Sequence, residues 1–243
     1  MSTYSHFAHL LIGLVLAAPA GAVTIIGTSN IFGSGYGDTP FPGGGGGGTL
    51  PLELMLPGGA MVVRFPSVTG TVTWCSDLLA MGNGPDGGLF ACGTTDILPH
   101  RAIAGILHGG ATMFLVGVFL GPVAPGPGPA PPRLDFSGGA LSTSFLALMP
   151  GLNQPFFIGD GLTGTGSGSL QTFVIPVGAT RLFLGFADAF EFGSPSSPPG
   201  FYGDNAGMLE ATVEFASIPE PGTLLLSAMG LALAAFRVKR RVA

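Results

Sequence analysis

The segment from Arg181 to Phe215 contains two stretches in which apolar side chains recur at every second position. The apolar positions are Leu182, Leu184 and Phe186 in the first stretch and Leu209, Ala211, Val213 and Phe215 in the second. Polar residues, Glu210, Thr212 and Glu214, alternate with those of the second stretch. A period of two is typical of a half-buried β-strand whose apolar side chains point inward. The segment therefore predicts a strand, a loop and a second strand.

Oxygen-bearing side chains occupy both ends of this loop. Asp188 lies just after the first strand, and Asp204 and Asn205 lie just before the second. If the two strands pair as antiparallel neighbours, these three side chains meet at one end of a sheet, where they offer the carboxylate and amide oxygens that calcium prefers. The alternative is that residues 203–205 form only a turn, because Asp and Asn side chains stabilise turns by hydrogen bonding to their own backbone.

The same residues resemble the calcium-binding signature near the C-terminus of the PA-IL-like bacterial galactose lectins. In that family a strand ends in an Asp, a loop carbonyl follows, and a Tyr-Gly-Asn-Asn-x-Gly segment precedes the last strand. Here Asp188 matches the Asp, and residues 202–207, Tyr-Gly-Asp-Asn-Ala-Gly, match the segment. The resemblance implies calcium ligands at the side chains of Asp188, Asp204 and Asn205 and at the carbonyl of Phe201, with two sugar hydroxyls completing the site. The loop after Asp188 is longer than in the lectins, and Asp204 replaces an Asn, which adds a negative charge that favours calcium.

A second part of the chain carries the same resemblance. Residues 68–74 alternate and predict a strand that ends in Trp74, and Gly-Pro-Asp-Gly follows at 84–87. In the lectins a strand that ends in an aromatic residue gives a backbone oxygen to calcium, and a Gly-Pro-x-Gly loop follows. The resemblance implies the carbonyl of Trp74 as a further ligand. The alternative for residues 84–87 is an ordinary surface turn.

The composition favours an exported all-β protein. The chain has 43 Gly and 22 Pro among 243 residues and only 9% charged residues, yet 47% of it is hydrophobic, which is enough to bury a core. We predict a two-sheet β-sandwich, similar to the PA-IL (galactose-binding-like) fold, over residues 50–218, with no internal repeat.

Further strands and loops follow from the same kind of pattern. Alternation on both sides of Pro-Gly-Gly at 57–59 predicts a hairpin over 50–65. Residues 102–107 and 113–120 are apolar enough for buried strands and suit the central hairpin of the lectins. We expect loops at 82–88 and 163–169 and an exposed polyproline-type insertion at 121–132.

Charge and cysteines narrow the partners and the compartment. Residues 1–218 carry four basic and twelve acidic residues, so this part of the chain repels nucleic acid. Cys75 and Cys92 permit one disulfide in an exported protein, and two buried thiols are the alternative.

The N-terminus predicts export. Residues 7–22 form a short apolar run that ends in Ala-Gly-Ala, which indicates a signal peptide over residues 1–22 rather than a spanning helix. The run departs from the usual pattern because no Lys or Arg precedes it. The glycine-rich segment 23–49 is expected to form a short strand near 23–26 and then a flexible loop.

The C-terminal residues 219–243 predict sorting at the membrane. Pro219, Glu220 and Pro221 come first, an uncharged apolar run from 223 to 236 follows, and a basic cluster ends the chain. The run is short for a spanning helix, and a core helix is the alternative, but the basic end indicates a membrane segment with the body outside the cytoplasm. This tail resembles the PEP-CTERM sorting signal of Gram-negative bacteria. The resemblance implies that an exosortase recognises the tripeptide at the inner membrane, removes the tail and transfers the body to a surface acceptor, so that the protein ends at the cell surface or outside the cell.

The sequence contains no motif of a known catalytic centre. H-E-x-x-H, C-x-x-C and G-x-S-x-G are all absent, and beyond the signal peptide only His100 and His108 remain, which we expect in a loop and a turn without a role. A hydrolase that pairs carboxylates among Asp160, Asp188 and Asp204 is the alternative, but nothing in their spacing favours it. We therefore expect no enzyme.

These observations predict an exported, exosortase-sorted surface protein whose sandwich binds calcium and, through it, carbohydrate. The expected ligand is the producer's own exopolysaccharide. The alternative is a non-catalytic structural protein of the extracellular matrix, in which calcium only joins two loops.

Overall fold

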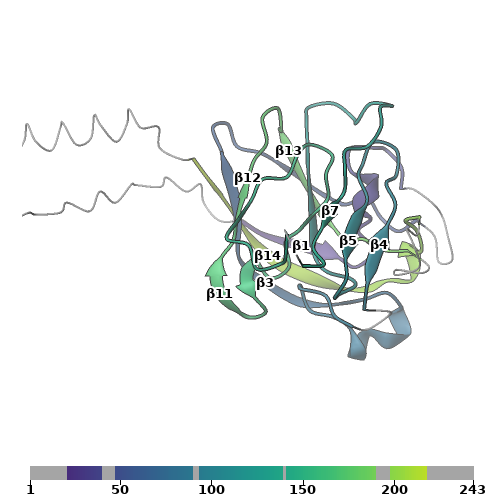
Figure 1. The fold of residues 1–243 in the computed structure, drawn as a ribbon. Helices are drawn as coiled ribbons and strands as arrows, with labels where there is room; N and C mark the ends of the chain where they lie inside the picture. The colour runs from purple at the N-terminus through teal and green to yellow at the C-terminus, as the bar shows by residue number, and fades with distance from the viewer. Residues whose placement is uncertain (1–20, 40–46, 90–92, 139–140, 190–197, 218–243) are drawn as a thin grey trace, which may run out of the picture.

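The computed structural model describes residues 21–39, 47–89, 93–138, 141–189 and 198–217. They fold mainly into strands, which is consistent with the predicted all-β sandwich (Figure 1). The first sheet has the order β1-β14-β3-β12-β8 and the second the order β2-β13-β6-β9. The strands of the first sheet are Gly21–Ile26 (β1), Ala206–Ala216 (β14), Val62–Thr73 (β3), Thr172–Val174 (β12) and Ala147–Leu148 (β8). Those of the second are Leu52–Met55 (β2), Arg181–Gly185 (β13), Val116–Leu120 (β6) and Phe156–Phe157 (β9).

Two smaller sheets and three short helical turns complete the described part of the chain. The strands of the three-stranded sheet are Thr95–Ile97 (β4), Ile106–His108 (β5) and Leu134–Asp135 (β7). Leu162–Gly164 (β10) and Ser167–Leu170 (β11) form a hairpin. The 3-10 turns are Ile31–Gly33 (η1), Ser76–Met81 (η2) and Tyr202–Asp204 (η3).

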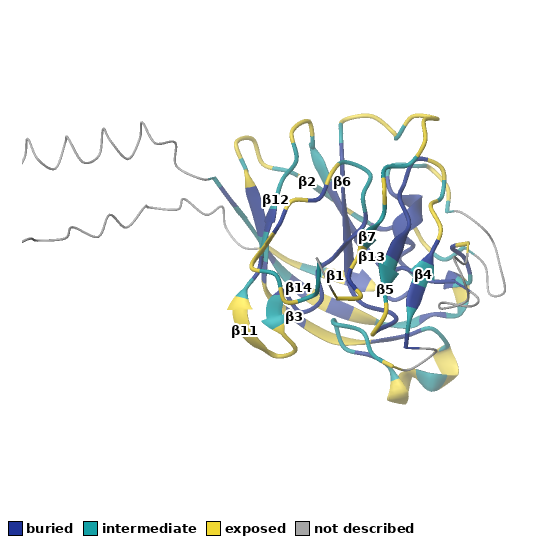
Figure 2. Cartoon of the chain, viewed as in Figure 1, coloured by how far each residue is buried: buried dark blue, intermediate teal, exposed yellow. Residues whose placement is uncertain are grey.

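The core lies between the two main sheets. Phe156 of the second sheet packs on Phe173 of the first with ring centroids 5.2 Å apart, and Phe65 meets Phe173 edge to face at 5.7 Å. Buried residues alternate with exposed or half-buried ones along β14, and exposed residues also interrupt the buried ones of β3 (Figure 2). The alternation read from the sequence is therefore the alternation between core and solvent.

The longest strand pairing joins β14 to β3 and fixes the positions of the loops at both ends of these strands. The register runs from Ala206 opposite Thr73 to Ala216 opposite Val62. It shifts by one residue near Pro66, whose nitrogen carries no hydrogen for the ladder, so the strand bulges there. β1 pairs antiparallel with the other edge of β14, from Gly21 opposite Val213 to Ile26 opposite Met208.

Several predicted pairings are wrong. β13 and β14 are not neighbours, because they belong to opposite sheets. The hairpin expected over 50–65 is instead a crossing between sheets, since β2 pairs with β13 and β3 pairs with β14. β5 and β6 do not pair with each other either. A period of two predicts which face of a strand is buried, but it contains no information about the partner strand.

Two loops predicted from their glycines are also more ordered than expected. Residues 163–169 form most of the β10–β11 hairpin rather than an open loop. In the segment predicted as flexible, Ile31 and Phe32 are fully buried, and β1 extends from Gly21. The N-terminal segment thus shares the core of the sandwich expected to begin at residue 50.

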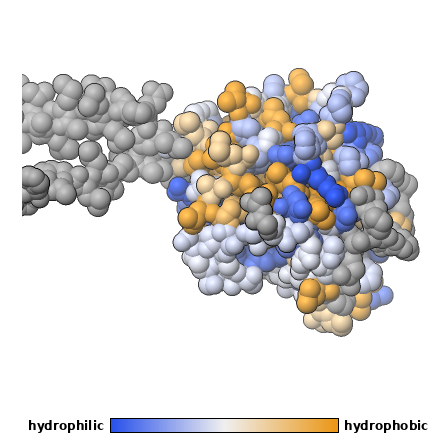
Figure 3. All heavy atoms as spheres, viewed as in Figure 1, coloured by the Kyte–Doolittle hydropathy of each residue, from blue (hydrophilic) through white to orange (hydrophobic). Residues whose placement is uncertain are grey.

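The described surface keeps many apolar side chains. Met55, Met149 and Val177 are among the most exposed. Figure 3 shows hydrophobic residues over the left and centre of one face, with more hydrophilic residues toward its right. Such a surface follows from a chain with only 9% charged residues, because too few polar side chains exist to cover it.

Candidate functional site

Asp188 is held at the end of β13 by a buried tyrosine. The Tyr202 hydroxyl accepts a hydrogen bond from the Asp188 backbone N–H at 2.9 Å and donates one to the Phe186 carbonyl at 2.9 Å. The N–H of Gly200 donates to the Asp188 carbonyl at 3.1 Å. Burial and the nearby Asp188 carboxyl raise the pKa of Tyr202 well above its usual value, so the hydroxyl keeps the proton that it donates. Tyr202 therefore joins the second sheet to the η3 turn.

Asn205 is fixed on the other side of the same junction. It follows η3 directly, and its Nδ2 donates to the Gly27 carbonyl at 3.1 Å, which leaves Oδ1 to point elsewhere. The next residue, Ala206, pairs with Thr73 at the end of the β3–β14 ladder. The first sheet thus sets the position of Asn205, and the second sheet sets that of Asp188.

The predicted cluster of Asp188, Asp204 and Asn205 does come together. Burial raises the pKa of Asp188 well above its usual value, the charge of nearby Asp204 raises it further, and hydrogen bonding from the Asn205 side chain lowers it. Only 2% of Asp188 and 6% of Asn205 is exposed. The atoms Oδ2 of Asp188, Oδ1 of Asp204 and Oδ1 of Asn205 are all buried without a hydrogen-bond partner among the described residues.

Such a set of oxygens fits calcium better than a transition metal. Unsatisfied buried oxygens are costly, and two carboxylates beside an amide oxygen are hard ligands that a hard cation would satisfy. Among the described residues no group of three or more His, Cys, Asp or Glu side chains is placed to hold a metal, and this cluster has two carboxyls and one amide. The cluster contains neither His nor Cys, the usual ligands of zinc, so it does not resemble a zinc site.

The two predicted carbonyl ligands lie beside the cluster along the chain. Trp74 follows Thr73, the residue opposite Ala206, so it comes next to Asn205 where the ladder ends. Phe201 precedes η3 in the left-handed conformation, with φ 67°. Calcium coordination by either carbonyl stays a prediction.

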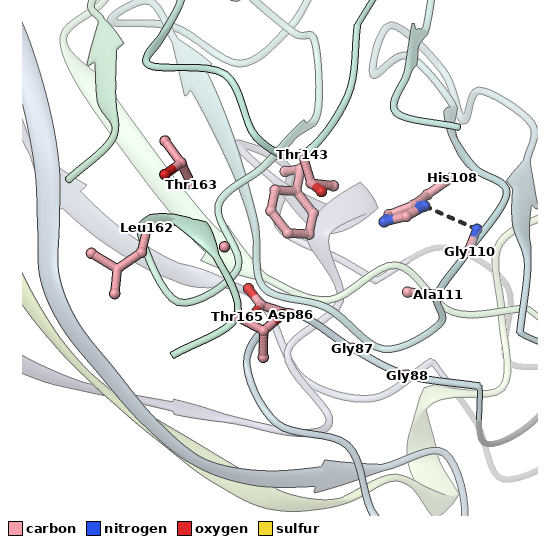
Figure 4. Close-up of a pocket in the computed structure, with 12 residues that line it drawn as sticks. Asp86, Gly87, Gly88, His108, Gly110, Ala111, Thr143, Leu162, Thr163 and Thr165 are labelled. Atoms are coloured by element: carbon pink, nitrogen blue, oxygen red, sulfur yellow. Dashed lines mark hydrogen bonds between the residues drawn. The ribbon is translucent and has the colours of Figure 1, made fainter. Parts of the chain in front are cut away.

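A pocket of about 220 Å³ lies on the other side of the end of β3. Val72 pairs with Gly207 on one side and with Asn83 on the other, and Asn83 begins the loop that carries Asp86. The pocket lies between this loop, the end of β5 and the β10–β11 hairpin, and Asp86, His108, Thr143, Phe157, Leu162 and Thr165 are among its lining residues (Figure 4).

Asp86 presents one oxygen to this pocket. Its Oδ1 accepts a hydrogen bond from the Asp160 backbone N–H at 2.8 Å, whereas Oδ2 is buried without a hydrogen-bond partner among the described residues. Burial raises the pKa of Asp86, and hydrogen bonding from the Asp160 backbone N–H and from the nearby Thr165 side chain lowers it. Figure 4 shows Asp86 and Thr165 together at the centre of the close-up.

His108 presents a donor to the same pocket. The Gly110 N–H donates to its Nδ1 at 3.1 Å, so the neutral ring carries its proton on Nε2. Figure 4 shows Nε2 facing the side on which Thr143 and Asp86 lie. Burial lowers the pKa of His108, and the ring packs on Phe114 and Phe157 with centroids 5.1 and 5.7 Å apart. The imidazole is therefore neutral near pH 7.

The sequence does not predict this pocket, although Gly-Pro-Asp-Gly at 84–87 marks the loop that carries Asp86. The pattern at 84–87 indicates only the lectin resemblance or a turn, and that around His108 indicates only a turn. Asp160 is one of the three carboxylates considered for a hydrolase. It accepts hydrogen bonds from the backbone N–H groups of Leu162 and Gly166. Its oxygens thus hold the β10–β11 hairpin.

The remaining predicted residues fall partly outside the described chain. Cys75 is half-buried and forms no disulfide with a described residue, and Cys92 lies outside the described residues, so their pairing stays a prediction. Residues 1–20 of the signal peptide predicted over 1–22 lie outside the described chain, whereas Gly21 and Ala22 belong to β1. The sorting residues Pro219, Glu220 and Pro221 also lie outside. Within the described ranges, no helix has the length and apolar character needed to cross a bilayer.

Comparison with known proteins confirms the sorting tail. Residues 217–241 match the model of the PEP-CTERM protein-sorting motif. The match supports export and exosortase-dependent sorting, as predicted, and it covers only the tail. Comparisons with curated proteins and with solved structures gave no match, so the likeness to galactose lectins rests on the motif residues alone.

Proposed function

We propose that this exported, exosortase-sorted protein is non-catalytic and binds calcium and, through it, exopolysaccharide at the end of its sandwich. The observation that carries the proposal is the group of three buried oxygens without partners, on Asp188, Asp204 and Asn205. Calcium supplies the positive charge that two adjacent carboxylates lack, and two sugar hydroxyls are suitable further ligands for it.

The position of this cluster along β14 suits a surface-binding protein. β14 begins at Ala206 beside the cluster and ends at Ala216, directly before the sorting motif at 217–241. Eleven residues of strand span on the order of 35 Å. The binding end is thus separated from the attachment end by the length of the longest sheet pairing.

A structural role for calcium is the second candidate, and one observation favours it. Asp188 and Asn205 are almost completely buried, and only Asp204 is partly exposed. A cation held there joins the end of β13 to the start of β14, and a sugar reaches it only past Asp204.

A calcium titration of the full chain tests both candidates. At a calcium concentration about 100 times its Kd, binding to the native state alone adds about 2.7 kcal/mol of stability, which raises the Tm of a chain of this size by roughly 5–10 °C. The double variant Asp188→Ala with Asp204→Ala should abolish that shift, and a shift of unchanged size would mean that calcium binds elsewhere.

Retention on a column separates lectin from structural calcium. Beads that bear galactose and beads that bear the producing cell's exopolysaccharide are loaded with calcium and eluted with EDTA. Calcium-dependent retention supports carbohydrate binding. A calcium-raised Tm without retention on either support would establish the structural role instead.

A further inference from the structure

The Asp86 pocket is built before any ligand arrives. The Pro85 carbonyl accepts a hydrogen bond from Leu115, and Gly88 and Thr112 exchange two backbone hydrogen bonds. Asn83 Nδ2 donates to the Thr112 carbonyl at 3.1 Å. The loop that carries Asp86 is therefore tied to the chain between β5 and β6 at both ends, which reduces the entropy lost on binding.

Gly159 lets the Asp86 carboxyl take its place. Its φ is +60°, and a Cβ at this position would lie 2.2 Å from Asp86 Oδ1 and 2.5 Å from the Phe157 ring. Only glycine accommodates both neighbours. This close approach holds Oδ1 on the Asp160 backbone and leaves Oδ2 for the pocket.

The polar groups of the pocket include donors and acceptors in close proximity. Asp86 Oδ2 is an acceptor without a partner among the described residues, and His108 Nε2–H is a donor. The hydroxyls of Thr143 and Thr165 can act as either. Phe157 and Leu162 add apolar surface to the same cavity.

These groups exclude several ligand classes. A divalent cation lacks ligands here, because Asp86 has one oxygen to offer and both oxygens of Asp160 accept backbone N–H groups. An anion is repelled by the carboxylate and meets only a neutral imidazole. A purely apolar molecule would leave Asp86 Oδ2 unsatisfied, which is costly.

A small neutral molecule with several hydroxyls satisfies all of these groups. Hydroxyls donate to a carboxylate and accept from an imidazole N–H, and the C–H face of a sugar ring packs on an aromatic side chain. The volume of about 220 Å³ lies below the roughly 300 Å³ at which pockets for drug-sized ligands begin, so it suits one ring rather than a chain of rings.

We propose that the pocket of Asp86, His108 and Thr165 binds a single neutral sugar residue and that it does so without calcium. This site lies across β3 from the calcium cluster and does not depend on the function proposed for that cluster. Asp86 accepts one sugar hydroxyl, His108 donates to a second oxygen, and Thr165 stands at the exposed turn of the hairpin that borders the pocket.

The test uses the full chain in EDTA and ligand-observed NMR with galactose, glucose, mannose and rhamnose as probes. We expect saturation transfer to at least one of these sugars and none to glucuronate, which the Asp86 carboxylate repels. No transfer from any neutral probe at about 20 mM would overturn the proposal, since a site with a Kd of about 1 mM or below is almost fully occupied at that concentration.

Three variants assign the binding to this pocket. Asp86→Asn keeps the size of the side chain and the hydrogen bond from Asp160, and His108→Phe keeps the ring packing but removes the donor. Each should weaken binding about tenfold or more, because one hydrogen bond to a polar ligand is lost. Thr165→Trp closes the pocket from an exposed turn, where the substitution does not threaten folding, and it should abolish binding.

Two control variants keep the outcome unambiguous. Thr69→Val on the exposed outer face of β3 should leave binding unchanged. Asp188→Asn, which disables the calcium cluster, should also leave sugar binding in EDTA unchanged. If Asp188→Asn removes the signal, or if Thr165→Trp retains it, the sugar binds elsewhere and this assignment is wrong, whatever the calcium titration shows.

Discussion

Asp188 is buried and Asp86 is half-buried, and the two carboxyls lie on opposite sides of the end of β3 in different surroundings. Burial raises the pKa of both. Near Asp188, the unpartnered oxygens belong to three neighbouring side chains, two of which, Asp188 and Asp204, are carboxyls that repel each other. Near Asp86, a single unpartnered oxygen shares a cavity with a neutral imidazole, and the oxygens of the second nearby carboxyl, Asp160, accept hydrogen bonds from backbone N–H groups.

The comparison teaches that the charge around a buried carboxyl decides what it binds. Two carboxylates with an amide oxygen have an excess of acceptors, which a cation relieves. One carboxylate with an N–H donor is balanced, and a hydroxyl-bearing ligand completes it. Neither the residue type nor the burial of a carboxyl is enough to distinguish a cation site from a site for a hydroxyl-bearing ligand.

The largest effect is expected from Tyr202→Phe, which removes the hydroxyl that holds Asp188 at the end of β13. The change removes an acceptor for the Asp188 N–H and a donor for the Phe186 carbonyl, both buried. The Asp188 N–H is left without an acceptor, whereas the Phe186 carbonyl keeps the hydrogen bond from the Ile31 N–H at 3.2 Å. The lost hydrogen bonds and the unsatisfied N–H cost about 2–3 kcal/mol. Chemical denaturation monitored by Trp74 fluorescence measures the loss.

Tyr36→Phe is the matched control for that substitution. The Tyr36 hydroxyl accepts one part-buried hydrogen bond, from the Ala102 N–H at 3.2 Å, and the ring stays under Arg101. We expect a loss of about 1 kcal/mol or less. Equal losses for the two variants would show that the Tyr202 hydroxyl does not hold the junction.

The next prediction concerns how the Asp188 carboxyl changes the stability of the fold as pH rises. In EDTA, a carboxyl whose folded pKa lies above its unfolded value stabilises the fold below the unfolded pKa, and this contribution is lost as pH rises through the folded pKa. Stability in EDTA should therefore fall as pH rises above the usual carboxyl pKa of about 3.9, and calcium should oppose the fall because it favours the ionised form. Thermal melts at a series of pH values above that pKa measure both trends.

Asp188→Asn isolates that contribution from the other titrating groups. The variant should be more stable than the unaltered protein in EDTA near pH 8 and less stable in excess calcium, with a difference in Tm of several degrees in each direction. The same order of stability with and without calcium would mean that no cation binds at Asp188.

The sequence predicted that Asp188, Asp204 and Asn205, the residues proposed to bind calcium, lie close together, but not the way in which they meet. The period of two placed Asp188 after one strand and Asn205 before another, and both strands exist as β13 and β14. The expected antiparallel pairing of these strands is wrong. Asp188 and Asn205 meet across the open end of the sandwich instead, because each sheet delivers one of them.

The Asp86 pocket could not be predicted because its parts share no local pattern. Its walls come from the loop at 84–88, the end of β5 and a hairpin near residue 165. Glycine-rich segments such as 163–169 predict turns, but whether a turn packs depends on what lies across from it. Gly159 is an example, since its role depends on Asp86, more than seventy positions earlier in the chain.

A smaller effect is expected from Gly159→Ala, which should disrupt the Asp86 pocket and leave the cluster of Asp188, Asp204 and Asn205 intact. The new Cβ would clash with Asp86 Oδ1 and with the Phe157 ring in a left-handed backbone conformation, which costs about 1–3 kcal/mol. Sugar binding in EDTA should be lost, while the calcium-induced shift in Tm stays the same.

Gly151→Ala controls for the loss of a glycine outside the pocket. A Cβ there meets only Gln154 Oε1 at 3.6 Å, an ordinary contact, so the change in stability should stay within about 0.5 kcal/mol. Calcium titration and NMR are repeated on both variants. If Gly159→Ala binds sugar as tightly as Gly151→Ala does, the position of Asp86 does not matter for the ligand.

The smallest effect separates the two carboxylates of the cluster from each other. Asp204 is partly exposed, whereas Asp188 is buried, so the charge of Asp204 acts through more solvent. Asp204→Asn should weaken calcium binding by roughly three- to tenfold, because calcium sites are tuned by the number of charged ligands, and Asp188→Asn should abolish it. Isothermal titration with calcium measures both. A loss at Asp204 as large as that at Asp188 would place the cation at the rim of the cluster, where solvent and a polysaccharide hydroxyl reach it, rather than in the junction between β13 and β14.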